Sequence, residues 1–348
     1  YFEFENCEIN KDDVKKLEDK MKDFVEKKIP IERERISYIE LLKYFEENKK
    51  TDKFKLLNGI NNSKLSIYRC EDFFELFDGP MVSNTDSLKI FSLIYYPPGF
   101  ILQFPKRSNV KVVAPFKEQR RIFEVYKESK EQGKVWNVDN VGSLNELVLN
   151  KRIDNFIQVC EAWQSRKIGR LADGIFSQRE KCKLVSIAGP SSSGKTTFSK
   201  RLSIELMSLG LKPFTISLDN YFVDRDKNPL GKDGKPDYET IDALNLDMFN
   251  EHLNMLFAGK KVKLPIYNFF TGKSSFSNEE TKINDGEIIV IEGIHCLNER
   301  LTYTVKKENK FKIYISPLTQ MNIDDNNRIP TTDNRLIRRM VRDYKYRG

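Results

Sequence analysis

Apolar residues in the first thirty positions recur every three or four residues, the spacing of one face of a helix. They are Val14, Leu17, Met21, Phe24 and Val25. Pro30 follows them, and proline disrupts a continuing helix. The pattern therefore predicts a helix over residues 11–28. A second helix is expected after Ser37, because Ser37 and Glu40 have the spacing of a capping box.

Between residues 64 and 105 the pattern changes to short runs rich in β-branched and aromatic residues. Three such runs cover residues 65–68, 88–91 and 101–104, and turn sequences such as Gly-Pro and Pro-Pro-Gly separate them. We expect these runs to be strands. Together with the two preceding helices they predict an α+β module over residues 1–142.

A longer helical stretch is expected next, opened by the S-x-x-E sequence that starts at Ser143 and extending to about Gln178. The apolar residues of one face are Ile153, Phe156, Ile157, Cys160 and Trp163. Helical spacing over such a length, between two regions of different pattern, is typical of a connecting helix. We interpret residues 143–180 as a helical linker between two domains.

From residue 181 onward, strand and helix patterns alternate. Short segments rich in apolar residues mark the expected strands at residues 184–188, 214–218, 288–291 and 311–315, and the segment 288–291 is apolar throughout. Uninterrupted apolar runs are typical of parallel strands that helices cover on both faces. The expected fold of residues 181–348 is therefore α/β, a parallel sheet with flanking helices of the P-loop NTPase type.

Composition narrows the class of protein. The 348 residues are 39% apolar and 32% charged, with no run of about 20 apolar residues of the kind that spans a bilayer. We expect a cytoplasmic protein with no membrane partner. Five widely spaced cysteines favour reduced thiols over disulfides or a zinc site, and two histidines exclude a His-rich metal centre. Because the chain begins with Tyr1 and stops at Gly348 within a helical pattern, we expect a fragment, incomplete at its C-terminus.

The net charge of +8 and the isoelectric point near 9.0 fit two kinds of partner, nucleic acid and small polyphosphates. Charge alone does not choose between them.

The most informative motif is Gly189-Pro190-Ser191-Ser192-Ser193-Gly194-Lys195-Thr196. It matches G-x-x-x-x-G-K-[ST], and an expected strand precedes it while an amphipathic helix follows. Such a loop cradles phosphates, because its backbone N–H groups and the helix N-terminus meet an anion. Lys195 is expected to reach the β- and γ-phosphates and Thr196 to hold Mg²⁺, with the following Thr197 in the nucleotide site. A serine-rich turn that caps an ordinary helix is the structural alternative.

Two carboxylates follow expected strands of the same sheet. Asp219 ends the strand at residues 214–218, and Glu292 ends the strand at residues 288–291. Ligands of open α/β sheets bind beyond the carboxyl ends of strands, so both carboxylates are expected near the phosphates. Asp219 could take the proton of an acceptor hydroxyl, and Glu292 could complete the Mg²⁺ shell through water. A helix-capping Asp and a solvated loop Glu are the structural alternatives.

The last segment carries four arginines on one helical stripe, at i, i+3, i+4 and i+7: Arg335, Arg338, Arg339 and Arg342. Like charges at this spacing repel one another, so a bound anion would explain the arrangement. We expect the stripe to stabilise the phosphoryl group in transit. The structural alternative is a solvated basic face.

Five motifs in order resemble the uridine kinase and phosphoribulokinase family of P-loop kinases. They cover residues 189–197, 217–222 (Ser-Leu-Asp-Asn-Tyr-Phe), 264–269 (Leu-Pro-Ile-Tyr-Asn-Phe), 291–295 (Ile-Glu-Gly-Ile-His) and 333–339 (Asp-Asn-Arg-Leu-Ile-Arg-Arg). The resemblance implies that Asp219 is the catalytic base and that Glu292 belongs to the Mg²⁺ site. It also implies an ATP lid made by Arg338, Arg339 and Arg342, and phosphorylation of a nucleoside 5′-hydroxyl.

The same resemblance implies an acceptor site at Tyr221, Phe222, Glu239, Tyr267 and Phe269. Glu239 could accept hydrogen bonds from ribose hydroxyls, and Tyr267 or Phe269 could stack on a pyrimidine. The sequence departs from the family in three places. Asn268 replaces an Asp, Gly272 replaces a base-reading His, and Tyr221-Phe222 reverses the usual order. Packing of these aromatic side chains in the core is the structural alternative.

Residues 2–104 resemble the second additional domain of threonyl-tRNA synthetases, on sequences such as Pro-Ile-Glu-Arg-Glu at 30–34 and Leu-Ser-Ile-Tyr-Arg at 65–69. That domain edits mischarged tRNA with a His/Cys cluster. Here its Cys-x-Gly-Pro-His segment reads Phe-Asp-Gly-Pro-Met at 77–81, so the resemblance implies a scaffold without editing residues. A small group of bacterial nucleoside kinases joins the two modules in this order.

The sequence thus predicts a kinase that uses ATP and Mg²⁺ to phosphorylate a small-molecule nucleoside, with uridine or cytidine as the expected acceptor. One alternative is a kinase of another sugar or sugar phosphate. A second is an RNA-binding regulator, with tRNA as partner, that uses ATP as a switch; its RNA affinity would fall steeply with salt. Self-association as a homo-oligomer is compatible with either.

Overall fold

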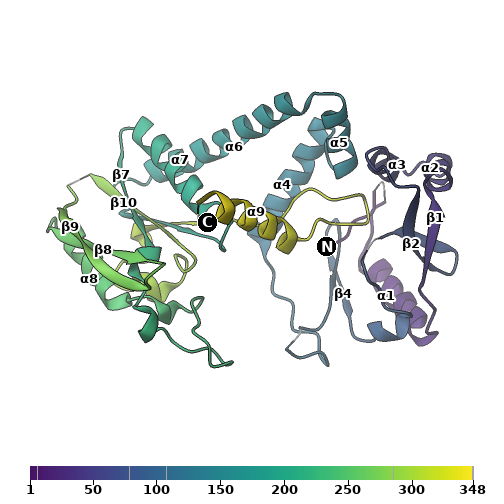
Figure 1. The fold of residues 1–348 in the computed structure, drawn as a ribbon, viewed down its shortest axis with the longest axis horizontal. Helices are drawn as coiled ribbons and strands as arrows, with labels where there is room; N and C mark the ends of the chain where they lie inside the picture. The colour runs from purple at the N-terminus through teal and green to yellow at the C-terminus, as the bar shows by residue number, and fades with distance from the viewer. Residues whose placement is uncertain (6, 78, 107, 285, 347–348) are drawn as a thin grey trace. The chain divides into compact units, whose positions relative to one another are not determined.

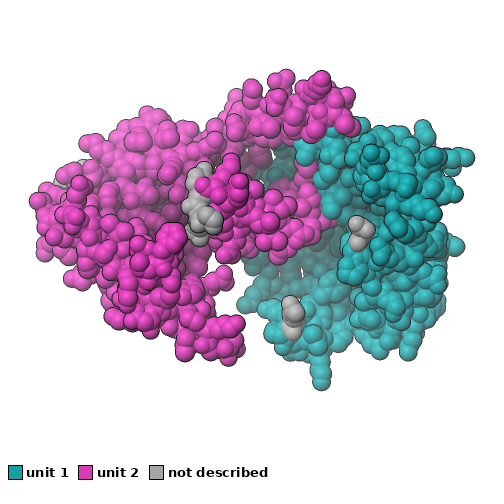
Figure 2. All heavy atoms as spheres, in the orientation of Figure 1, with its two compact units in different colours: residues 1–146, 322–327 teal, residues 147–321, 328–348 magenta. Residues whose placement is uncertain are grey.

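The structure is a computed structural model that describes residues 1–5, 7–77, 79–106, 108–284 and 286–346. The chain divides into two compact units, coloured separately in Figure 2. Unit 1 consists of Tyr1–Glu146 together with Asn322–Asn327, and unit 2 of Leu147–Met321 together with Arg328–Gly348. A short segment late in the sequence therefore belongs to the N-terminal unit, although we expected all of residues 181–348 in one domain. In the described part of the chain, no helix is long and apolar enough to cross a membrane.

Unit 1 combines helices with antiparallel strands, which gives it the expected α+β character (Figure 1). Its helices are α1 (Lys11–Glu26), α2 (Tyr38–Glu47), α3 (Thr51–Leu57), the 3₁₀ helix η1 (Thr85–Leu88), α4 (Arg120–Trp136) and α5 (Val141–Leu149), which continues past the unit boundary. Its strands are β1 (Glu32–Ser37), β2 (Lys64–Cys70), β3 (Phe73–Leu76), β4 (Ser92–Tyr96) and β5 (Gly99–Gln103). Strands β1, β2 and β3 form one antiparallel sheet, and β4 pairs with β5.

The capping signals of unit 1 are confirmed in part. The expected capping box at the start of α2 is present, because the Glu40 N–H donates to the Ser37 hydroxyl and the Glu40 carboxylate accepts from the Ser37 N–H. The S-x-x-E sequence at Ser143 does not open a helix. Helix α5 already begins at Val141, and the Ser143 N–H donates to Oδ1 of Asn140 at 2.9 Å. Asn140 is the better cap because its side chain lies one turn ahead of Ser143.

Two other expectations for this region are wrong. The strand expected at 88–91 is absent, because Asn84 caps a 3₁₀ helix by accepting from the Asp86 N–H, and the next strand begins only at Ser92. The helical stretch expected over residues 143–178 is two helices. The chain turns at Lys151, which has φ of +56°, and α6 (Ile153–Phe176) follows. The end of α6 packs into the core of unit 2, so it is more than a linker.

Unit 2 is built on a parallel sheet of four strands in the order β11-β6-β10-β7, which confirms the expected α/β fold. Its strands are β6 (Leu184–Ala188), β7 (Lys212–Ser217), β10 (Glu287–Gly293) and β11 (Lys310–Tyr314), with a separate hairpin of β8 (Val262–Asn268) and β9 (Lys273–Thr281). Its helices are α6, α7 (Lys195–Ser208), α8 (Leu246–Phe257) and α9 (Thr331–Tyr346). Short 3₁₀ helices are η2 (Leu218–Tyr221), η3 (Arg225–Lys227), η4 (Ile241–Ala243), η5 (Glu299–Thr302) and η6 (Lys307–Asn309).

Both faces of this sheet are covered. Side chains alternate along a strand, so Leu184 of β6 packs into one core with α8, while Val185 packs into another core with α6 and α7. Every residue of β6 is buried. The uninterrupted apolar runs in the sequence are explained by this double cover. Since all four strands are parallel, their carboxyl ends meet at one edge, and the loops that follow them form the site.

Candidate active site

The loop at residues 189–194 connects β6 to α7, so strand, loop and helix follow in the expected order. Two glycines allow its shape. A Cβ on Gly189 would lie 2.8 Å from the Ser193 hydroxyl and 2.9 Å from the Ile315 carbonyl oxygen. Gly194 has φ of +93° and precedes α7 without any side-chain cap on that helix. Among the residues that the structure describes, no side chain therefore accepts from the first N–H groups of this helix, which leaves them available to a phosphate.

The polar side chains of the loop fit a nucleotide triphosphate. The hydroxyls of Ser192 and Ser193 are buried and have no hydrogen-bond partner within the described part of the chain. Buried hydroxyls normally find an acceptor, and phosphate oxygens would supply one. Lys195 donates to the Pro190 carbonyl at 3.3 Å, so its ammonium already lies along the loop. Ser191 is exposed.

Thr196 and Glu292 meet at the start of α7. The Thr196 hydroxyl donates to Oε1 of Glu292 at 2.9 Å, and Ser217 contacts the same oxygen at 3.4 Å. Glu292 is only 7% exposed, and this burial raises the pKa of its carboxyl above the ordinary value. A hydroxyl beside a buried carboxylate is an oxygen donor set that suits Mg²⁺. Thr197, the next residue of α7, is exposed.

Asp219 lies in η2, directly after β7, and its side chain is exposed. Its negative charge contributes to raising the pKa of Glu292 and of the buried thiol of Cys296, after burial itself. Asp219 is therefore close enough to the Thr196 and Glu292 pair to act on it electrostatically. The two carboxylates differ in environment, since Glu292 is buried whereas Asp219 is exposed. This difference suits one for a metal shell and the other for proton transfer.

The arginine stripe of α9 divides into two pairs (α9 is yellow in Figure 1). Arg338 donates from Nε to the Ser192 carbonyl at 3.1 Å, and Arg335 donates to the Ser191 carbonyl at 3.4 Å. Arg339 and Arg342 instead contact the Asp343 carboxylate, with nitrogen–oxygen distances of 3.5 and 2.7 Å. The stripe therefore lies on the phosphate loop through one pair only. Arg335 was in the expected stripe but outside the residues that the family resemblance marks as the lid.

Three aromatic side chains gather beside η2. The ring centroids of Tyr267 and Phe269 are 5.0 Å apart, and Phe222 lies 5.7 and 6.2 Å from them. Phe269 is 48% exposed, whereas Tyr267 is 7% exposed. Asn220 joins this cluster to η2, because its side-chain oxygen accepts from the Tyr267 N–H at 3.4 Å. A ligand ring could reach Phe269 far more easily than Tyr267.

Tyr221 is a correction to the expected acceptor site. It is 2% exposed and packs edge-on against Phe249 in the core, with ring centroids 4.9 Å apart. Its hydroxyl and Nδ1 of His252 are 3.0 Å apart. A ring enclosed on all sides cannot stack on a nucleoside base. The reversed Tyr-Phe order therefore directs the tyrosine into the core and leaves Phe222 in the aromatic cluster.

Glu239 is exposed in the segment before η4, and its N–H donates to Asp237. His295, three residues after Glu292, contacts the backbone of Glu239 and Thr240, and burial lowers the pKa of its imidazole. Nε2 of His295 is buried without a partner in the described part of the chain. Sequence reasoning passed over His295 as a site residue. Its position in the Ile-Glu-Gly-Ile-His motif, as one of two histidines, was the available signal.

The turn of the β8–β9 hairpin explains two departures from the family pattern. The side-chain oxygen of Asn268 accepts from the N–H groups of Phe270 and Thr271, so an amide holds this turn. Gly272 has φ of +69°, and a Cβ there would lie 2.6 Å from Nε of Arg225. Any side chain at position 272 would collide with this arginine. Arg225 also donates to the Phe269 carbonyl at 2.6 Å.

Comparison with known proteins agrees with this geometry. The chain matches the model of the Phosphoribulokinase / Uridine kinase family over residues 184–348. A uridine kinase of Lactobacillus helveticus is 32% identical over 170 residues, which cover 49% of this chain and 71% of that protein. A uridine kinase of Clostridium tetani is 31% identical over 169 residues, covering 47% and 69%.

Among solved structures, one of a possible uridine kinase from Bacillus stearothermophilus covers 52% of this chain and 89% of that chain. It is 21% identical with a TM-score of 0.36, a likeness too weak to add to the sequence matches. The identity to the Lactobacillus helveticus protein, over more than two thirds of its length, is sufficient by itself. On these matches the chain belongs to the phosphoribulokinase and uridine kinase family.

Proposed function

We propose that this chain transfers the γ-phosphate of ATP to the 5′-hydroxyl of a nucleoside in the presence of Mg²⁺, with uridine or cytidine as acceptor. The observation that carries the proposal is the meeting of Thr196 and Glu292 beside the phosphate loop, with the charge of Asp219 acting on the same carboxyl. Relatives named uridine kinase support a nucleoside as the acceptor.

The phosphate side of the reaction rests on residues 189–197 and α9. Loop N–H groups and the hydroxyls of Ser192 and Ser193 would bind phosphate oxygens, and Lys195 would bind the β- and γ-phosphates. Thr196 and Glu292 would hold Mg²⁺, which neutralises charge on the phosphates when bound. Arg338 lies on the loop and would stabilise the transferring group from the other side.

The acceptor side would place the nucleoside 5′-hydroxyl against Asp219. The carboxylate accepts the hydroxyl proton as the oxygen attacks the γ-phosphorus, and the bond from that phosphorus to the β-bridging oxygen breaks to leave ADP. Phe269 would stack on the base, with Phe222 and Tyr267 supporting it. Glu239 would accept hydrogen bonds from the ribose hydroxyls.

Arg339 and Arg342 are proposed to complete the lid. Both guanidinium groups contact the Asp343 carboxylate in the structure. A triphosphate offers more negative charge than one carboxylate and could draw these guanidinium groups away from it. The lid would then act in two stages, with Arg338 in place before the nucleotide and the other two after it.

A second acceptor class has one observation in its favour. Arg225 fills the space beside Gly272, where uridine kinases place a base-reading side chain. The pocket for a pyrimidine edge would therefore differ from that of the relatives, and another sugar or a sugar phosphate is the alternative acceptor. Its phosphorylation would use the same loop, metal pair and Asp219.

An acceptor screen separates these two possibilities. ATP carrying a radiolabelled γ-phosphate is incubated with single nucleosides, free sugars and sugar phosphates, and the labelled products are separated. The proposal predicts the highest kcat/KM for uridine or cytidine, and label in nucleoside 5′-monophosphate. Label in a sugar phosphate alone would establish the second class. Label only in inorganic phosphate would contradict both.

The role of unit 1 and the location of the protein in the cell follow from the sequence resemblance alone. We propose that unit 1 is a scaffold related to the editing domain of threonyl-tRNA synthetases, without its His/Cys cluster and without tRNA chemistry. A cytoplasmic location fits a kinase that draws on ATP and small nucleosides. Steep loss of RNA affinity with rising salt would instead favour an RNA-binding role.

A further inference from the structure

The segment that contains η3 holds the turn of the β8–β9 hairpin. Arg225 donates from Nη2 to the Phe269 carbonyl at 2.6 Å, and its Nη1 lies 3.5 Å from the Phe270 carbonyl. The Arg225 N–H donates to the Gly272 carbonyl at 2.8 Å. Since a Cβ at Gly272 would lie 2.6 Å from Nε of Arg225, the glycine leaves the space that this side chain fills. One arginine thus contacts three carbonyl groups of a single turn.

The residues on either side of Arg225 add contacts to the same turn. Oδ1 of Asp224 accepts from the Ser274 N–H at 2.9 Å. The Lys273 ammonium lies 3.1 Å from Oδ1 of Asp226 and 3.6 Å from Oδ2 of Asp224. The side chains of Lys273 and Asp226 are 58% and 65% exposed, and exposed ion pairs contribute little to stability. The hydrogen bonds to backbone groups therefore matter more than the ion pairs for the position of the turn.

The hairpin depends on contacts outside itself. Within the described residues, β8 and β9 pair only with each other, and an isolated two-stranded hairpin is at best marginally stable. Most side chains of β9 are exposed. The end remote from the turn is fixed by Val262, which packs into the core of unit 2. At the turn end, the buried Tyr267 and the contacts of the η3 segment do the same.

The η3 segment is itself fixed in relation to Asp219. Five residues separate Asp219 from Arg225. Among them, Tyr221 is buried in the core, and the Val223 N–H donates to the Ala243 carbonyl at 2.9 Å. The chain between Asp219 and Arg225 therefore has little freedom to move. A group that Arg225 binds is held at a set place relative to Asp219.

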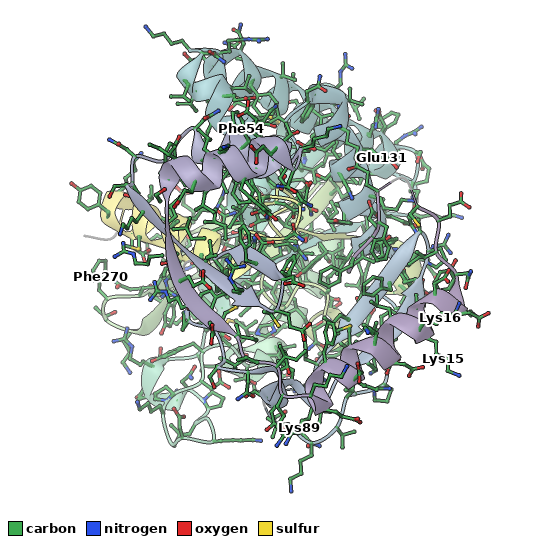
Figure 3. All side chains as sticks on the ribbon, turned by 90° about the vertical axis from the view of Figure 1, so that its right-hand side faces the viewer. Lys15, Lys16, Phe54, Lys89, Glu131 and Phe270 are labelled. Carbon is green, nitrogen blue, oxygen red and sulfur yellow. The ribbon has the colours of Figure 1, made fainter. Side chains whose placement is uncertain are left out.

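Arg225 binds the backbone of the residue whose ring is proposed to stack on the acceptor base. Phe269 is 48% exposed and lies in the cluster with Tyr267 and Phe222. Phe270, the next residue, is 86% exposed and is labelled in Figure 3. Because neighbouring residues of the turn direct their rings differently, a change in backbone geometry here would turn the Phe269 ring out of the cluster. The carbonyl contacts of Arg225 oppose such a change.

We propose that Arg225 is a positioning residue for the acceptor site, because it fixes the backbone of Phe269 and thereby the place of its ring. The inference rests on the proposed function only in assigning that ring to the acceptor base. A guanidinium suits this task, since its N–H donors form a rigid planar fork that can hold neighbouring carbonyls at once. A ring held in place before the acceptor binds loses less conformational entropy on binding.

Three variants test the role of the guanidinium. Arg225→Met removes its donors and keeps an unbranched side chain at an exposed position, where the fold should tolerate it. Arg225→Lys keeps a cation but replaces the fork by one ammonium. The matched control is Lys273→Met, which breaks the exposed ion pairs of the same turn and leaves the carbonyl contacts of Arg225 in place.

Hydrogen–deuterium exchange of the amides of residues 270–274 is measured on the full chain of each variant, without ligands. Arg225→Met should speed this exchange by roughly threefold to tenfold, the usual effect of losing one hydrogen bond. Arg225→Lys should speed it less, and Lys273→Met should change it by less than about twofold. Unchanged exchange in Arg225→Met would overturn the proposal. So would an equal acceleration in the control.

Steady-state kinetics with uridine separates a positioning role from a general structural one. Arg225→Met should raise the KM for uridine by roughly threefold to fivefold, no more than the loss of one stacking contact, while kcat and the KM for ATP stay constant. In a chain that already carries Phe269→Ala, Arg225→Met should raise the KM no further, because the two residues act through one contact. A further rise in the double variant, or a fall in kcat without a change in KM, would contradict the positioning role.

The two measurements also separate this inference from the proposed function. If the unsubstituted chain phosphorylates no acceptor, the proposed function fails, and the exchange result still decides whether Arg225 holds the Phe269 backbone. If uridine is phosphorylated with the same KM by Arg225→Met, the proposed function stands and the positioning role fails.

Discussion

The two sides of the site in unit 2 are built in different ways. The phosphate side comes from one continuous loop and the helix after it, with Glu292 added from the neighbouring strand. The proposed acceptor side would be assembled from η2, the segment before η4, and the β8–β9 hairpin. In the proposed reaction, backbone amides of one loop would bind the phosphates, whereas single side chains would contact the acceptor. We therefore expect substitutions on the phosphate side to alter turnover and those on the acceptor side to alter the choice of acceptor.

Asp219 is proposed to act on both substrates, so its substitution should have the largest effect. Asp219→Asn keeps the shape of the side chain but removes the base, and kcat should fall by roughly a hundredfold to ten-thousandfold. The KM for ATP should change little, because the loop is untouched. Steady-state kinetics in which both substrate concentrations are varied measures kcat and the KM for ATP separately.

Asp226→Asn is the matched control, since Asp226 is an exposed carboxylate in the following 3₁₀ helix that contacts Lys273. Turnover of this control should equal that of the unsubstituted chain. Undiminished turnover in Asp219→Asn would remove Asp219 from its role.

Lys195→Ala should have the next largest effect, confined to the phosphate side. Loss of the ammonium removes a fixed charge from the transferring group, which lowers kcat by roughly a hundredfold to a thousandfold. Affinity for ATP should fall as well, unlike in Asp219→Asn. Calorimetric titration with ATP and Mg²⁺ measures the affinity. Lys200→Ala, on an exposed position of the same helix, should be silent.

On the acceptor side, Phe269→Ala should raise the KM for the nucleoside by roughly fivefold, the value of one aromatic stacking contact. The KM for ATP should not change. Phe270→Ala is the control, because Phe270 is the next residue and is 86% exposed (labelled in Figure 3). Equal effects of the two substitutions would indicate that the hairpin turn, not a stacking contact, determines acceptor affinity.

The smallest predicted effect concerns stability and pH. Burial raises the pKa of Glu292 above its ordinary 4.5, so the folded chain holds that proton more tightly than the unfolded chain. Ionisation of this carboxyl therefore destabilises the fold. This loss in the free energy of unfolding is absent at a pH below the pKa that Glu292 has in the unfolded chain. It reaches its full size once the pH has risen above the pKa that Glu292 has in the folded chain. Glu292→Gln should melt at a higher temperature than the unsubstituted chain at neutral pH, without nucleotide or metal.

The difference in melting temperature between Glu292→Gln and the unsubstituted chain should shrink as the pH falls toward 4.5, the ordinary pKa of a glutamate. Thermal unfolding at several pH values measures this difference. The same variant should lose Mg²⁺-dependent turnover. A lower melting temperature at neutral pH would mean that the ionised carboxylate stabilises the fold.

Sequence predicted the parallel sheet and the phosphate side because their signals are local. A mostly apolar segment of five residues, a fixed loop motif and a helical pattern follow one another in one short stretch around Gly189. Two single side-chain hydrogen bonds decide the local structure elsewhere, at the start of α5, which Asn140 caps, and at the 3₁₀ helix after Asn84. They override the weaker sequence patterns that predicted a helix start at Ser143 and a strand at residues 88–91. A single hydrogen bond from a side chain to the backbone can thus decide local structure, although it leaves no trace in the spacing of apolar residues along the sequence.

The burial of Tyr221, the contact at Gly272 and the pairing of Lys53 with Asp324 could not be predicted, because distant segments create them. Nothing in the sequence near Tyr221 distinguishes a core ring from a stacking ring; the contact with Phe249 does. The collision that Arg225 imposes at Gly272 arises only when the hairpin folds back. Lys53 and Asp324 are likewise 271 positions apart, and each looks like an ordinary surface charge until the fold buries both.

In the proposed reaction, Asp219 aims an acceptor hydroxyl at the terminal phosphate of ATP. A crystal structure of the chain with a non-hydrolysable ATP analogue, Mg²⁺ and uridine would show whether the two groups meet. We expect the Asp219 carboxylate to lie within about 2.6–3.2 Å of the nucleoside 5′-hydroxyl, with Thr196 on the metal. A nucleoside bound elsewhere, or an Asp219 carboxylate turned away from that hydroxyl with all ligands present, would contradict it.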